Sequence, residues 1–297
     1  MVDVKEVANN VYRLETSIPG MDTIFATYLI QESDVVLIEP GPTAAIPSIQ
    51  EGMKQLGMDD LAYIIPTHIH MDHAGSIGTL AQLFPGAKVL VHPRGIKHAI
   101  DPSRLIDSTK MVFGADFEAR FGPIAPVQES QILVPEDGEI IHINGRELHI
   151  IYAPGHAPHH MVIFDPGLKG LFCGEALGFP SLSTRILPLP AVAPPSFDHD
   201  QYLETIERMR QLGARMLFYS HGGAESKADV LISMAAENTR IFGDLILNAL
   251  KDGETLEAIN RRIGDHITSR YRLKVNETDI TTIVGGYVVY FKNKGVA

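Results

Sequence analysis

The chain has 297 residues, of which 45% are hydrophobic, and its 36 acidic and 25 basic side chains give a formal charge of −11. This balance argues against a broad nucleic-acid-binding surface, whose affinity depends on clustered Lys and Arg, and a single cysteine excludes an internal disulfide. Residues 1–6 lack the apolar core of a signal peptide, and no apolar run approaches the roughly 18 residues of a membrane span. We therefore expect a cytoplasmic protein that binds neither membrane nor nucleic acid.

The apolar pattern predicts the elements of the first part of the chain. Short apolar runs predict strands at residues 11–15, 24–30, 35–39, 61–66 and 88–91. Apolar side chains at helical spacing predict helices at residues 45–56 and 77–84.

Two hairpins and four helices are predicted for the rest. Strands at residues 140–143 and 147–152 flank Asn144-Gly145, a strong turn signal, and strands at residues 162–164 and 170–174 flank a second turn. A helix at residues 201–212 leads into a strand at 216–219, and helices are expected at 227–250, 256–271 and 277–290. Strands and helices mixed in this order predict an α/β fold with two packed sheets covered by helices.

The most informative stretch is residues 67–75, which directly follows the strand predicted at 61–66. In an extended segment, side chains two positions apart share a face, so His68 and His70 converge on one point. Asp72 and His73 fall where the chain turns into a helix, so they aim at a neighbouring point. Burying these four side chains without a metal would leave polar groups unpaired. One loop thus offers ligands to two metal ions.

At these residues the chain resembles the metallo-β-lactamase superfamily, whose signature is His-x-His-x-Asp-His. The resemblance implies a first metal held by His68, His70 and His156, a second held by Asp72, His73 and His221, and a bridging carboxylate at Glu175. It also implies the four-layer αββα sandwich of that family, with the metals along one edge. In this reading, residues 1–225 form the family domain, and residues 226–297 form a C-terminal helical extension packed on it.

Two positions depart from the family pattern, because Glu175 and Glu39 stand where the family usually carries Asp. We expect Glu39 and His160 to contact the metal ligands and orient them, as partners of this kind do. No cysteine stands in for a ligand. We expect two divalent metal ions, with zinc as the first choice and iron and manganese left open, since geometry and availability decide selectivity.

The resemblance implies a binuclear metal-dependent hydrolase that uses a metal-bound hydroxide on a small ester, thioester or lactone-like substrate. Asp72 would orient the nucleophile and is the expected catalytic residue. The alternative is a non-haem di-iron protein that binds or reduces oxygen. The expected partner is a small-molecule substrate, and a homodimer stays open.

Two inserts interrupt the pattern of strands and helices. Residues 94–122 have a mostly helical pattern, which fits a lid, a dimer contact or ordinary packing. Residues 177–197 are rich in proline and apolar side chains, which fits an apolar wall for the substrate or a structural loop. Within that insert, Arg185 is either a partner for an anionic group or a solvated side chain.

Overall fold

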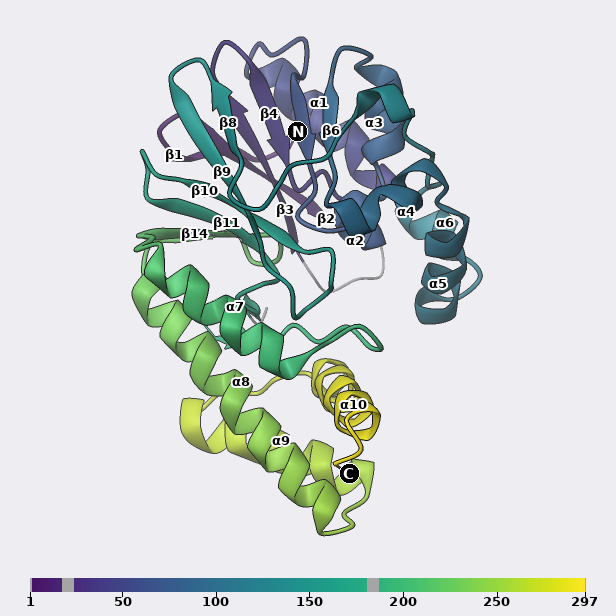
Figure 1. Cartoon of the computed structure of the whole chain (residues 1–297), viewed down its shortest axis with the longest axis vertical. Coiled ribbons are helices and arrows are strands. Elements are labelled where there is room, and N and C mark those ends of the chain that lie inside the picture. The colour runs from purple at the N-terminus through teal and green to yellow at the C-terminus, as the bar shows by residue number, and fades with distance from the viewer. Residues whose placement is uncertain (1, 18–23, 181–186, 297) are drawn as a thin grey trace. The chain divides into compact units, whose positions relative to one another are not determined.

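The structure, a computed structural model, describes residues 2–17, 24–180 and 187–296, so that Arg185 lies outside the described residues. The chain divides into two compact units (Figure 1). Unit 1 comprises Met1–Tyr152, His159–Gly174 and Arg215–Ser226. Unit 2 comprises Ala153–Pro158, Glu175–Ala214 and Lys227–Ala297. The expected division at residue 225 into a family domain and an extension stays a prediction.

Unit 1 contains a seven-stranded sheet whose strands lie in sequence order. Its strands are β1 (Val4–Ala8), β2 (Val11–Ser17), β3 (Ile24–Gln31), β4 (Val35–Ile38), β5 (Tyr63–Ile65), β6 (Lys88–Leu90) and β7 (Ile132–Leu133). Strands β1 to β4 pair antiparallel, whereas β4 to β7 pair parallel. The sequence pattern predicts β2 to β6 but misses β1 and β7, because β1 is partly exposed and β7 has only two residues.

The inner parallel strands β4 and β5 are largely buried on both faces, as their apolar runs require. Successive side chains point to opposite faces, so Ile64 joins the core beneath helices α1 (Ile46–Gln55) and α3 (Ile77–Leu83). Its neighbour Ile65 faces the other way and joins a second core. A rigid, doubly buried strand therefore precedes the histidine-rich loop.

The second sheet of unit 1 has six strands in the order β15-β14-β11-β10-β9-β8. Its strands are β8 (Ile140–Ile143), β9 (Arg146–Tyr152), β10 (Met161–Asp165), β11 (Gly170–Gly174), β14 (Met216–Tyr219) and β15 (Ala224–Glu225). Tyr28 and Ile65 of the first sheet share one core with Phe172 and Phe218 of the second, so the two sheets pack face to face. The turn at Asn144-Gly145 is confirmed, with φ angles of 43° and 93°.

The 94–122 insert is helical, as its pattern predicts, and also belongs to unit 1. It forms α4 (Ile96–Ile100), α5 (Ser103–Phe113) and α6 (Phe117–Phe121). Phe117 and Phe121 are fully buried in a small cluster with Phe25 and Met71. The insert is thus packed onto the residue that precedes Asp72 in sequence, while Met111 on α5 is 81% exposed.

Unit 2 is mainly helical, and the four long helices among its described residues confirm the predicted ones. They are α7 (His199–Gln211), α8 (Ala228–Lys251), α9 (Leu256–Tyr271) and α10 (Glu277–Asn293), and the short strands β12 (Phe179–Pro180) and β13 (Pro188–Leu189) pair beside them. Helix α7 begins two residues before the predicted start because the Asp198 carboxylate accepts from the amides of Asp200 and Gln201. Among the described residues, no helix has the length and apolar character needed to cross a membrane.

Candidate metal centre

The histidine-rich loop follows β5 and turns into the short helix α2 (Met71–Ala74). His70 has extended backbone angles and its carbonyl accepts from the amides of His73 and Ala74, so it begins the helical turn. The imidazoles of His68 and His70 face each other, with 2.8 Å between Nε2 of the first and Nδ1 of the second. The predicted i, i+2 convergence of these two rings is therefore present in unit 1.

A second group of donor atoms in unit 1 gathers around Asp72. Its Oδ2 lies 3.5 Å from Nε2 of His73 and 3.6 Å from Nε2 of His221. Asp72, His73 and His221 each offer a ligand atom, and these three atoms lie within 4.8 Å of one another. Two imidazole nitrogens and one carboxylate oxygen are a donor set that divalent transition metals take. These residues therefore fit a metal ion.

Glu39 holds the ring of His73 from the opposite side. Its Oε2 lies 2.6 Å from Nδ1 of His73, and both side chains are buried. A carboxylate on Nδ1 keeps a proton there and leaves Nε2 as the lone pair that a metal requires. Glu39 also has a left-handed backbone, with a φ angle of 56°, which costs a non-glycine residue about 1–2 kcal/mol. Strain of this kind concentrates at functional sites.

The ring of His68 is enclosed by its chain neighbour Thr67, by His160 just before β10, and by the end of β11. Thr67 Oγ1 lies 3.1 Å from its Nδ1, and the His160 ring stacks on it at 4.8 Å. Gly174, at the end of β11, has a φ angle of 51°, and a Cβ there would lie 2.4 Å from Thr67 Oγ1 and 2.8 Å from His160 Nε2. The sequence analysis missed Thr67 and Gly174, although each directly precedes a predicted ligand.

Unit 2 carries the other two predicted ligands, and it brings them together. Nε2 of His156 lies 3.0 Å from Oε2 of Glu175, and both side chains are largely buried. Nδ1 of His156 lies 3.0 Å from the carbonyl oxygen of Ala191. Because a carbonyl only accepts, this contact places the proton on Nδ1, as Glu39 does for His73.

Comparisons with known proteins place these residues in a family. The sequence pattern of the Metallo-beta-lactamase superfamily matches residues 22–221. A metallo-beta-lactamase fold-containing protein of Sulfurisphaera tokodaii is 30% identical over 70% of this chain and 75% of its own length. The chain belongs to the metallo-beta-lactamase superfamily.

Two further proteins extend the comparison. The structure of a metallo-beta-lactamase family protein from Thermus thermophilus matches with a TM-score of 0.72 at 22% identity, covering 98% of this chain and 95% of that one. An atrochrysone carboxyl ACP thioesterase of Aspergillus fumigatus is 20% identical over 69% of this chain and 51% of its own length. The predicted α/β metallo-β-lactamase fold, with two sheets and C-terminal helices, is confirmed, and the chain is an enzyme of the metal-dependent hydrolase class.

The only cysteine of this metallo-β-lactamase superfamily chain, Cys173, is inaccessible to solvent and substrate. It is fully buried, burial raises the pKa of its thiol well above the usual value, and its Sγ contacts the carbonyl oxygen of Phe218 at 3.5 Å. A thiol held neutral in this way is neither a nucleophile nor a thiolate ligand.

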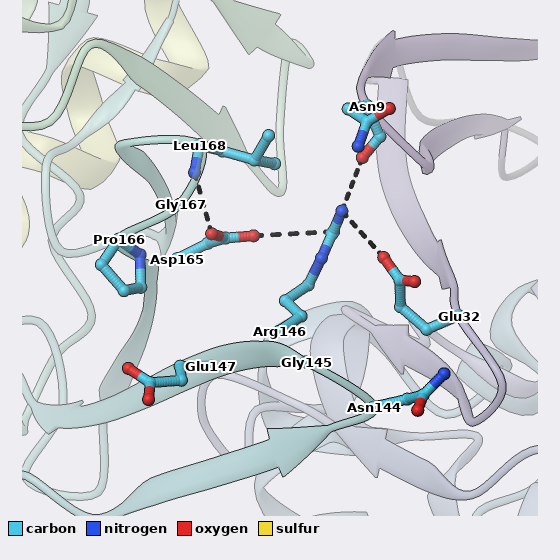
Figure 2. A pocket seen from close by; sticks show the side chains of 10 residues that line it. All are labelled: Asn9, Glu32, Asn144, Gly145, Arg146, Glu147, Asp165, Pro166, Gly167 and Leu168. Carbon is cyan, nitrogen blue, oxygen red and sulfur yellow. Dashed lines mark hydrogen bonds and ion pairs between the residues drawn. The ribbon is translucent and has the colours of Figure 1, made fainter.

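A polar cavity of about 460 Å³ lies at the β8–β9 and β10–β11 turns of unit 1 (Figure 2). At its centre, Nη2 of Arg146 donates to the carbonyl oxygen of Asn9 at 2.7 Å and pairs with Glu32 at 3.1 Å. Its Nη1 lies 3.5 Å from Oδ2 of Asp165, whose side chain is 1% exposed. Asp165 ends β10, whereas His160 precedes the start of that strand, so this ion-pair cluster and His160 belong to opposite ends of β10.

Proposed function

We propose that the chain is a binuclear metal-dependent hydrolase acting on a small ester, thioester or lactone. The observation that carries the proposal is the donor cluster of Asp72, His73 and His221 in unit 1. Catalytic metal sites in proteins combine three such protein ligands with a position open to water or substrate. The 22% exposure of the Asp72 side chain leaves this cluster accessible to small molecules.

We assign the first metal to His68, His70 and His156, the second to Asp72, His73 and His221, and the bridge to Glu175. Chain connectivity supports the inclusion of the two ligands from unit 2. Glu175 follows Gly174 of unit 1 directly, and His156 lies in the segment Ala153–Pro158, which continues into unit 1 at both ends. Because each residue spans at most about 3.6 Å, these short tethers limit how far the two side chains lie from the strand ends.

Bound divalent ions supply Lewis acidity and activate water near neutral pH. The protein residues orient the reactants. We assign Asp72 to orient the nucleophile, because its carboxylate faces two imidazoles and is still accessible to water. Glu39 keeps the proton of His73 on Nδ1, and the Phe25 ring contacts the His221 ring edge-on with 5.0 Å between centroids.

The charge of the chain supports an uncharged substrate. A formal charge of −11 repels polyanions, and residues 187–197, which follow Glu175 along the chain, carry no charged side chain. The relative from Aspergillus is named a thioesterase, which places thioester cleavage among the activities of this chain's relatives. Small esters, thioesters and lactones share an acyl carbonyl whose oxygen becomes negative during attack, which a cationic site stabilises.

The test combines metal analysis with a hydrolase panel. Protein purified without added metal is assayed for zinc, iron and manganese, and then for hydrolysis of esters, thioesters and lactones before and after chelation. We expect two divalent ions per chain and activity that is lost on chelation and restored by metal. His70→Ala should abolish activity without unfolding the sheets, whereas His142→Ala, whose side chain is 70% exposed on β8, is the matched control.

Three outcomes would contradict the proposal. The first is a chain that binds no divalent ion, and the second is equal loss of activity in His142→Ala and His70→Ala. The third is bound iron with oxygen consumption and no hydrolysis on the panel, which would support oxygen chemistry instead.

A further inference from the structure

Tyr202 of helix α7 is fully buried. Hydrogen bonds connect its hydroxyl to both predicted metal ligands of unit 2, directly to the Glu175 backbone and through Ala191 to His156. The geometry points to Tyr202 as a positioning residue that sets the orientation of both His156 and Glu175. This inference rests on the proposed function, since it concerns the affinity of the same metal site.

The first connection runs to Glu175. The Tyr202 hydroxyl donates to the backbone carbonyl oxygen of Glu175 at 2.8 Å. This bond holds the main chain at the residue whose carboxylate is the predicted bridge. Glu175 directly follows β11, so the hydrogen bond restrains the chain as soon as it leaves the sheet.

The second connection runs through the proline-rich segment to His156. The amide of Ala191 donates to the Tyr202 hydroxyl at 3.4 Å, and the carbonyl oxygen of the same residue lies 3.0 Å from Nδ1 of His156. One hydroxyl therefore restrains Ala191, the residue whose carbonyl oxygen accepts from Nδ1 of His156, and this contact in turn directs the Nε2 lone pair. Nε2 of His156 and Oε2 of Glu175 lie 3.0 Å apart, so both connections end at the same pair of ligand atoms.

Helix α7 and its N-cap residue also restrain the backbone of the two residues before His156. Gly155 has a φ angle of 131°, and a Cβ there would lie 2.4 Å from the Cα of Tyr202, so only glycine allows this approach. The Asp198 amide donates to the Gly155 carbonyl oxygen at 2.8 Å, and Oγ1 of Thr205 donates to that of Pro154 at 2.6 Å. The loop is thus restrained at the two residues before His156 as well as at its ring.

Loss of the Tyr202 hydroxyl leaves the Ala191 amide and the Glu175 carbonyl without this partner, while the aromatic ring still fills its place in the core. The two ligands then lose part of their preorganisation, and metal binding must supply the ordering. Substitution of residues that orient metal ligands lowers metal affinity about 10–100-fold. Because Tyr202 acts on His156 through one intervening residue, Ala191, we expect the lower end, about tenfold.

The experiment compares Tyr202→Phe with Tyr287→Phe in the full-length chain. Tyr287 is the matched control because it is also fully buried in unit 2 and its hydroxyl donates to a backbone carbonyl, that of Thr239, at 3.0 Å. Zinc affinity is measured by competition with a chromophoric chelator, and the visible spectrum of the cobalt-loaded protein reports ligand geometry. We expect Tyr202→Phe to weaken zinc binding about tenfold and to change the cobalt spectrum, with Tyr287→Phe matching the wild type in both.

If Tyr202→Phe does not fold, Thr205→Val provides the second test, since it replaces a buried hydroxyl that donates next to the His156 loop by a methyl group. It should also weaken zinc binding relative to Tyr287→Phe. Wild-type affinity in both Tyr202→Phe and Thr205→Val overturns this inference and leaves the proposed function standing. A wild-type chain that binds no divalent ion overturns the proposed function and this inference together.

Discussion

Substitution of Arg146 by Met tests how the two sheets of unit 1 are joined at the end of β10 that bears Asp165 (Figure 2). Arg146 begins β9, while two of its partners, Asn9 and Glu32, belong to turns of the first sheet. Met keeps an unbranched apolar side chain of similar reach but removes every donor of the guanidinium. The change therefore removes the charge pairing and little of the packing.

The size of the effect follows from the burial of the partners. The side chains of Arg146 and Asp165 are 9% and 1% exposed, so the carboxylate that remains has little contact with water. Removal of one partner of a buried ion pair costs about 3–5 kcal/mol, because it leaves an uncompensated charge. We expect Arg146→Met to lower the free energy of unfolding by about that amount.

A double-mutant cycle with Asp165→Asn isolates the charge effect. The amide oxygen of the replacement can still accept from the Leu168 amide, which Oδ1 of Asp165 does at 3.0 Å. With the Asp165 charge removed, loss of Arg146 should cost its bond to the Asn9 carbonyl and its pair with the partly exposed Glu32, about 1.5–3 kcal/mol. The double variant should thus be more stable than the sum of the two single effects predicts.

The assay is urea unfolding followed by far-ultraviolet circular dichroism, since the chain has no tryptophan to serve as a fluorescent reporter. The metal content of the variants is measured in parallel and should match that of the wild type, because the ion-pair cluster and His160 belong to opposite ends of β10. A loss below about 1 kcal/mol for Arg146→Met, or effects additive within about 0.5 kcal/mol, would refute this reasoning.

Three further predictions concern the candidate metal centre and its surroundings. Glu175→Asp retracts the predicted bridge by about 1.5 Å, so one metal ion should bind more weakly by calorimetric titration, and excess metal should restore turnover; unchanged affinity for both ions contradicts a bridging role. Gly174→Ala places a Cβ 2.4 Å from Thr67 Oγ1 in a left-handed conformation, so it should lower both the unfolding midpoint and metal occupancy, whereas Gly138→Ala, at a positive φ with no atom near the added Cβ, should lower only the midpoint. Burial, and then the Arg94 charge, lowers the pKa of His92 to about 4. As the pH falls, the unfolded chain therefore takes up the proton before the folded chain does, and the free energy of unfolding decreases by at most about 3 kcal/mol from pH 6.5 to pH 4. His92→Asn, which keeps an acceptor for the Arg94 amide, should flatten this pH dependence in urea titrations.

The sequence alone was sufficient to predict the parts of the fold that depend on local patterns. Alternating and continuous apolar runs predict strands β2 to β6, and the Asn144-Gly145 turn follows from the positive φ angles that a tight hairpin requires. His68, His70, Asp72 and His73 stand within six positions, so their convergence depends only on an extended segment followed by one helical turn. Partly exposed or very short strands, such as β1 and β7, are not predicted from the sequence because they carry little apolar periodicity.

Only the tertiary structure decided which residues support the predicted ligands. The Tyr202 hydroxyl lies 27 residues along the chain from the Glu175 carbonyl that it binds, and Arg146 donates to a carbonyl 137 residues away. No local pattern marks such pairs, because a buried tyrosine or a charged turn residue fits many partners until sheet register and helix packing select one. The left-handed backbone of Glu39 and the close packing of Gly174 likewise cannot be predicted locally, because both depend on neighbours that other parts of the chain supply. Short-range geometry is encoded in adjacent residues, whereas long-range hydrogen bonds form only after the whole core has set the distances between elements.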